Sequence, residues 1–67
     1  MRKRILRIVA ESNLGIYEFC EHIGVNYDTF RKWIRGSRTP MAKNIVKICK
    51  TCKVSADWLL GLKDNND

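Results

Sequence analysis

Several features that would mark an enzyme or a membrane protein are missing from this 67-residue sequence. It has one histidine, no glycine-rich phosphate-binding loop and no evident pair of nucleophile and base, so the sequence predicts no enzymatic activity. No apolar run approaches the roughly 20 residues that a membrane-spanning helix needs. Arg7 and Glu11 interrupt the segment that would be the apolar region of a signal peptide, which favours a cytoplasmic protein.

The sequence also has few cysteines, and their number is odd. Three cysteines suit a reducing compartment better than a disulfide-stapled secreted domain. Cys49 and Cys52 have the spacing of a metal or redox pair, but on a helix their Cβ atoms would lie about 5–6 Å apart, too far for a disulfide. Cys20 and His22 would point about 200° apart on one helix and cannot converge on one metal. We expect no metal, no cofactor, and thiols that act as small buried hydrophobes.

Positive charge is abundant. Thirteen Lys and Arg residues against seven Asp and Glu give a formal net charge of +6. On so short a chain this balance favours a polyanionic partner, either a nucleic acid or an anionic membrane surface. Apolar residues make up 45% of the sequence and only one residue is proline, so we expect residues 1–67 to form one folded domain.

The apolar residues recur at helical spacing, and no strand alternation is visible, so the predicted fold is all-α with five short helices. Asn13, Gly24, Gly36 and Gly61 are expected to end helices, and Asn26 and Ser55 to begin them. The predicted helices cover residues 2–12, about 16–23, 26–34, about 41–52 and 55–60. The polar residues 63–67 are expected to form a frayed tail.

Two of these helices are expected to carry an apolar stripe that faces the core. Ile5, Leu6, Ile8 and Val9 form the stripe of the first helix. The fourth helix is expected to place Pro40 at its first turn and to present an apolar face made of Met41, Ile45, Ile48 and Cys52. Lys43, Lys47 and Lys50 fall on the opposite side, where they form either a solvent-exposed face or a contact surface.

The segment 16–34 has the properties of a helix-turn-helix. Two helices of about eight residues meet at the short turn Gly24–Asn26, which suits helices that cross at a steep angle. Cys20 is small enough to let the two helices approach, and Gly24 permits a positive φ in the turn. The predicted shared core consists of Phe19, Ile23, Val25, Phe30 and Trp33.

Taken together, these motifs resemble the phage-repressor and Cro-type helix-turn-helix proteins, the lambda-repressor-like or XRE group. The matching residues are Leu14, Phe19–Cys20, Ile23–Asn26, Thr29–Phe30, Trp33, Arg35–Pro40 and Val54–Gly61. The resemblance covers about residues 5–62. Three positions depart from the family pattern: Ile16 stands where the second helix usually opens with Gln, Ile34 replaces a frequent Glu, and Asp28 puts a carboxylate where DNA approaches.

The resemblance implies a sequence-specific regulator of transcription that binds double-stranded DNA, of the phage or mobile-element repressor type. Its recognition helix would be 26–34, lying in the major groove. The residues that this implies near base edges are Asn26, Tyr27, Asp28, Arg31 and Lys32. Those implied near phosphates are Tyr17, Arg35, Ser37, Arg38, Thr39 and Lys43.

Other interpretations remain open for the same residues. Arg31, Lys32, Arg35 and Arg38 are also what a merely solvated face would contain, and Tyr27 has the alternative of packing on the core. The departures at Ile16, Asp28 and Ile34 would suit a module that binds a protein instead of DNA. Binding to RNA or to an anionic membrane is a third class, although the apolar face of the fourth helix is needed for the core.

The apolar C-terminal segment predicts a weak homodimer. Trp58, Leu59, Leu60 and Leu62 are four large apolar residues within five positions, more than a one-turn helix needs for its own core. We expect Trp58, Leu59 and Leu62 to form the interface, and the alternative is that the monomer buries all four. The sequence implies no membrane partner and no small-molecule effector.

Overall fold

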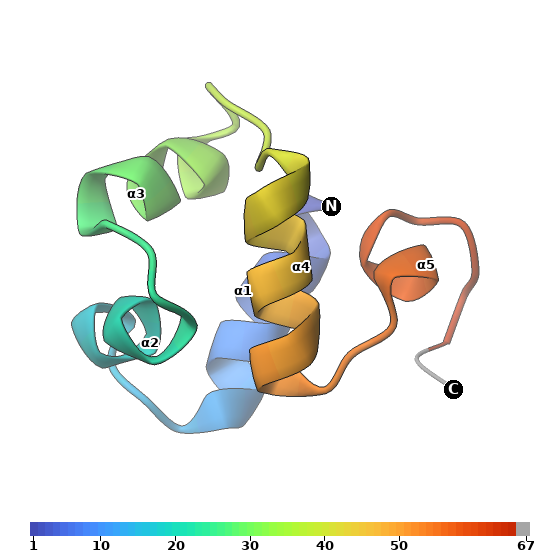
Figure 1. Cartoon of the computed structure of the whole chain (residues 1–67), viewed down its shortest axis with the longest axis horizontal. Coiled ribbons are helices and arrows are strands. Elements are labelled where there is room, and N and C mark those ends of the chain that lie inside the picture. Colours follow the sequence, from blue (N-terminus) through green and yellow to red (C-terminus); the bar gives the residue numbers. More distant parts are fainter. Residues whose placement is uncertain (66–67) are drawn as a thin grey trace.

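The computed structural model describes residues 1–65, which form five helices and no strand. The helices are α1 (Arg2–Ser12), α2 (Ile16–Ile23), α3 (Tyr27–Arg35), α4 (Ala42–Cys52) and α5 (Ala56–Leu59). Figure 1 shows α4 crossing in front of α1 at the centre, with α2 and α3 on one side of this pair and α5 on the other. Within residues 1–65 no helix is long and apolar enough to cross a membrane. The predicted all-α fold is confirmed.

Local capping signals explain where the helices begin and end. The side chain of Asn26 accepts a hydrogen bond from the backbone N–H of Asp28 at 2.7 Å, so it caps α3 as predicted. Ser55 caps α5 in the same way by accepting from the N–H of Trp58 at 3.4 Å. Asn13 ends α1 in the left-handed conformation, at a φ of 61°. The helix ends therefore lie within about two residues of their predicted positions.

The predicted place of Pro40 and parts of two apolar stripes were wrong. Pro40 is buried but lies before the N-cap residue Met41, so it belongs to the loop and not to the first turn of the helix. Met41 itself is 65% exposed, because its extended backbone at the N-cap takes its side chain off the core-facing stripe. Leu6 is 43% exposed, since it lies 100° around α1 from the buried Ile5.

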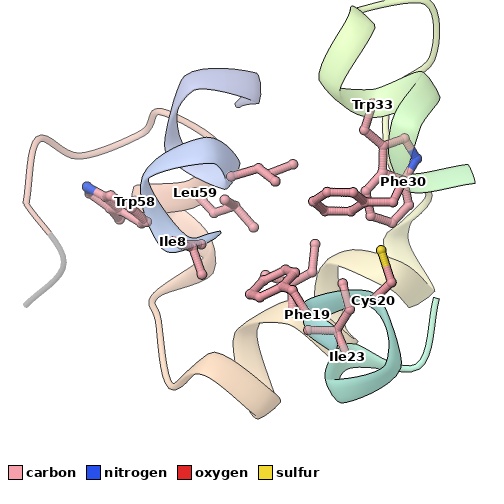
Figure 2. Close-up of a cluster of buried hydrophobic side chains, with 10 residues drawn as sticks. Ile8, Phe19, Cys20, Ile23, Phe30, Trp33, Trp58 and Leu59 are labelled. Atoms are coloured by element: carbon pink, nitrogen blue, oxygen red, sulfur yellow. The ribbon is translucent and has the colours of Figure 1, made fainter. Parts of the chain in front are cut away.

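The core joins all five helices through ten buried side chains. They are Ile5, Ile8, Phe19, Cys20, Ile23, Phe30, Trp33, Ile48, Trp58 and Leu59. Figure 2 shows Phe19 of α2 facing Phe30 of α3, and their ring centroids lie 5.7 Å apart. Phe30 in turn meets the ring of Trp33 edge to face at 5.8 Å. The predicted shared core of the helix-turn-helix is confirmed, with Val25 packed half-buried against it.

The C-terminal segment folds back on α1, which corrects two of the residues predicted for a dimer interface. Trp58 and Leu59 are buried in the chain's own core, 4% and 0% exposed, while Leu60 and Leu62 lie on the surface. Arg4 holds this arrangement by donating hydrogen bonds to the carbonyl oxygens of Trp58 and, at 2.8 Å, of Lys63. Lys63 is thus tied to α1, whereas residues 66 and 67 of the predicted frayed tail lie outside the described residues.

Candidate nucleic-acid interface

The turn between α2 and α3 is held by both backbone and side-chain contacts. Gly24 has a φ of 74°, a conformation that side-chain-bearing residues rarely adopt. Its N–H donates to the carbonyl of Glu21 at 3.2 Å, and the N–H of Val25 donates to the carbonyl of Cys20 at 3.0 Å. Lys47 of α4 donates from Nζ to the carbonyl oxygen of Gly24 at 3.2 Å. The angle between α2 and α3 is therefore anchored to a third helix.

The two faces of α3 differ sharply. Phe30 and Trp33 are buried on one face, while Arg31, Lys32 and Arg35 are exposed on the other. Together with Asp28, these three cations line a shallow hollow of about 130 Å³. Within residues 1–65 the structure shows one ion pair, between Arg7 and Glu11, so none of the three cations is neutralised by a described carboxylate. The exposed face of α3 is strongly positive.

The loop after α3 extends this positive surface. Gly36 ends the helix at a φ of 80°, and both the N–H and the hydroxyl of Ser37 donate to the carbonyl of Lys32, at 3.0 and 3.3 Å. Arg38 and Thr39 follow in the exposed part of the loop. Lys43 is exposed in the first turn of α4. We call Arg31, Lys32, Arg35 and Arg38 the basic strip.

A contact from α1 to the end of α3 could not be read from the sequence. The guanidinium of Arg2 donates to the carbonyl oxygen of Arg35 at 3.4 Å. It also lies so close to Gly36 that a Cβ there would be 2.8 Å from its Nη1 atom. Arg2 therefore positions the C-terminal end of α3 from 33 residues away in sequence. The sequence shows that the N-terminus is basic, but no nearby residue indicates that Arg2 contacts α3.

Tyr17 and Tyr27 meet at the N-terminal ends of α2 and α3. Their rings stack with centroids 4.4 Å apart and an interplanar angle of 29°. Tyr17 is 67% exposed, whereas Tyr27 is half-buried and packs against the core. The structure thus shows the core packing that the sequence offered as one alternative for Tyr27, and a role of this side chain near DNA stays a prediction. Asn26 and Asp28 flank it and are exposed.

The cysteines lie in surroundings that favour the protonated thiol. Burial raises the pKa of Cys20 and of Cys49. Burial also raises the pKa of Cys52, and the neighbouring Cys49 adds to that shift. Metal ligation requires the thiolate, and residues 1–65 contain no group of three or more His, Cys, Asp or Glu side chains placed to hold a metal ion. All three cysteines are free, and Cys20 is buried.

Comparison with known proteins agrees with this arrangement. A protein-family model described as helix-turn-helix matches residues 4–59, which include α2 to α5 and all of α1 except its first two residues. The chain belongs to this helix-turn-helix family. The family resemblance found in the sequence is thereby confirmed.

One curated relative is similar to most of this helix-turn-helix chain. It is a protein of Haemophilus influenzae (strain ATCC 51907 / DSM 11121 / KW20 / Rd) described as an HTH-type transcriptional regulator, and it is 37% identical over 57 residues. The match covers 85% of this chain but 23% of the relative, so the chain spans about a quarter of that protein's length. The search of solved structures found no significant match.

Proposed function

We propose that this helix-turn-helix domain binds double-stranded DNA in a sequence-specific manner and regulates transcription, with α3 lying in the major groove. The observation that carries the proposal is the exposed, unpaired basic face of α3, set on a helix-turn-helix whose opposite face is fixed in the core. Phosphates repeat along both DNA strands, so a surface with several unpaired cations gains affinity by releasing counterions. Membership of the family and the description of the relative support the same function.

Within this proposal some residues of α3 and its surroundings contact base edges, and others contact phosphates. Arg31 and Lys32 carry donors suited to the O6 and N7 atoms of guanine, and Asn26 and Tyr27 lie at the end of the helix that enters the groove. Asp28 is favourable near DNA when it accepts from a cytosine amino group or is held beside Arg31 or Lys32. The proposed phosphate contacts are Tyr17, Arg35, Ser37, Arg38, Thr39 and Lys43. The exposed N–H groups at the start of a helix also suit phosphate.

Alanine variants separate base readout from general affinity. A duplex is first selected from genomic fragments, and its affinity is compared with that of random DNA. Arg31→Ala and Lys32→Ala should lose about 1–3 kcal/mol on the selected site and little on random DNA. Arg38→Ala, in the loop, should weaken both alike because it meets phosphate. Equal losses on both kinds of DNA for all three variants would refute direct readout by α3.

We further propose that the domain acts as a repressor of the phage type by occupying its site. A reporter gene placed behind the selected site should lose expression when the protein is present, and Arg31→Ala should restore it. If neither random nor selected duplexes bind even at low salt, the domain is a protein-interaction module instead. The departures at Ile16 and Ile34, of which Ile16 is exposed, make that the second candidate.

A weak homodimer would let two α3 helices reach successive turns of the major groove, about 34–36 Å apart. Leu62 is 73% exposed and follows the segment that packs on α1, so we propose that the contact centres on Leu62 and Leu60. Leu62→Lys should shift sedimentation toward the monomer and weaken binding to a palindromic site. A wild-type protein that stays monomeric on one unrepeated half-site, with the variant indistinguishable from it, would exclude the dimer.

A further inference from the structure

The end of the helix-turn-helix where α2 and α3 begin differs in charge from the rest of the proposed interface. From residue 14 to residue 30 the sequence contains no lysine or arginine, and the basic strip begins at Arg31. The segment does contain carboxylates, among them Glu18 and Asp28, which are both exposed. Side-chain cations therefore release no counterions at this end, and its contacts with DNA must be of another kind.

The surface at this end is largely apolar. Ile16 and Tyr17 are the first two residues of α2, and they are 44% and 67% exposed. Tyr27, the first residue of α3, stacks on Tyr17 with the ring centroids 4.4 Å apart. The two helices lie on the same side of the pair formed by α1 and α4 (Figure 1). The stack thus joins the starts of both helices into one exposed aromatic and aliphatic surface.

The stack decides which ring is open to a ligand. Tyr27 is half-buried and packs against the core, and Tyr17 covers it from outside. One face of the Tyr17 ring is covered by Tyr27, and since the residue is 67% exposed, its other face is open. The stack also restricts the Tyr17 side chain, so a contact on its open face costs less conformational entropy than one with a free side chain.

We propose that the open face of Tyr17 contacts the 5-methyl group of a thymine in the major groove, with Ile16 completing the apolar contact. The thymine methyl is the apolar group that the major-groove edge of a base pair offers, and aromatic and aliphatic side chains suit it. The proposal rests on the proposed function, since it places the starts of α2 and α3 against duplex DNA. The hydroxyl of Tyr17 stays available for the phosphate contact proposed above.

The test measures the affinity of the chain for the selected duplex with each thymine replaced in turn by deoxyuridine. This change removes the 5-methyl group and keeps the hydrogen-bonding atoms of the base pair. We expect one thymine at which the replacement weakens binding about fourfold, the effect of burying one methyl group. Unchanged affinity after every replacement would overturn the thymine contact and leave the proposed function standing. A chain that binds no duplex would refute the proposed function, and this contact with it.

Two variants of Tyr17 separate its ring from its hydroxyl. Tyr17→Phe keeps the ring, so it should weaken binding to the thymine and deoxyuridine duplexes alike and retain the difference between them. Tyr17→Ala should bind the two duplexes equally. Arg38→Ala is the control for a general loss of affinity, and it should retain the difference. A difference that persists in Tyr17→Ala would assign the methyl contact to another side chain and overturn the proposal.

A direct measurement distinguishes Tyr17 from Tyr27, whose ring loses its neighbour in the alanine variant. In the NMR spectrum of the wild-type complex, the methyl protons of the sensitive thymine should show nuclear Overhauser effects to the ring protons of Tyr17. Effects to the ring of Tyr27 and none to that of Tyr17 would overturn the proposal.

Discussion

Gly24 and Gly36 both end helices at positive φ, but their surroundings differ. A Cβ on Gly24 would have no atom within 4 Å, whereas one on Gly36 would lie 2.8 Å from Nη1 of Arg2. Gly24→Ala should therefore cost about 1–2 kcal/mol, from the left-handed backbone alone. Gly36→Ala should cost about 0.5 kcal/mol more, because Arg2 must move and release the carbonyl of Arg35. Urea titrations measure both losses.

The role of Arg2 is checked by repeating the pair in an Arg2→Ala background. With the guanidinium gone, the two glycine variants should lose the same free energy of unfolding. A difference between them that persists would mean that Gly36 is crowded by something other than Arg2.

Cys20 lies where α2 packs against its neighbours in the core, and it is 3% exposed. Cys20→Leu adds volume to a filled space, so it should cost about 1–3 kcal/mol. For a domain of this size each kcal/mol corresponds to about 4–8 °C in Tm, which thermal melts resolve. Cys20→Ala is the control, since it keeps the side chain small and should melt closer to the wild type. Wild-type stability in the leucine variant would mean that the helix crossing has spare room.

At the scale of elements, α5 is too short to be stable alone and depends on its packing against α4 and on side-chain contacts from α1. Arg4 donates to the carbonyls of Trp58 and Lys63, and its guanidinium lies 5.2 Å from the centroid of the Trp58 ring. The carbonyl of Trp58 also accepts from the N–H of Gly61 at 3.1 Å, whereas the bond to Lys63 ties the segment after α5 directly to α1. Arg4 therefore holds the C-terminal segment on α1.

Arg4→Gln should loosen the contact between the C-terminal segment and α1. We expect a loss of about 1–3 kcal/mol, because two hydrogen bonds from a half-buried charged donor disappear. The amides of Leu59–Leu62 should exchange faster with deuterium, while those of α3 change less. Arg7→Gln is the matched control: Arg7 approaches the same tryptophan ring but is exposed, so its loss should cost less than about 1 kcal/mol. Equal effects of the two variants would contradict the role of Arg4 in holding the C-terminal segment.

At the scale of the whole molecule, the basic strip predicts a defined salt dependence for DNA binding. If the positive surface around the basic strip meets about four phosphates, the logarithm of the binding constant should fall against the logarithm of salt concentration with a slope near −3.6. Arg38→Ala should reduce the slope by about 0.9. Lys50→Ala, near the other end of α4 from the loop, should leave it unchanged. A slope near zero for the wild type would contradict the proposed interface.

Local signals in the sequence determined the helices and one face of the site. A cap such as Asn26 or Ser55 acts on backbone groups two or three residues away, so the residues that decide a helix end are its neighbours in the chain. The same holds for α3, where helical spacing separates Phe30 and Trp33 from the exposed cations. The helix ends, the core of the helix-turn-helix and the cationic face of α3 could therefore be predicted.

Only the tertiary structure decided how the ends of the chain are used. Trp58 and Leu62 are both large and apolar, yet one is buried and the other exposed, because α5 packs Trp58 into the shared core and Leu62 follows the end of that helix. Arg4, 54 residues earlier in the chain, donates to the carbonyl of Trp58. The contact between Arg2 and Arg35 and the stack of Tyr17 on Tyr27 likewise join separate helices. Burial is a property of packed elements, and no pattern within a single helix specifies which neighbour will cover it.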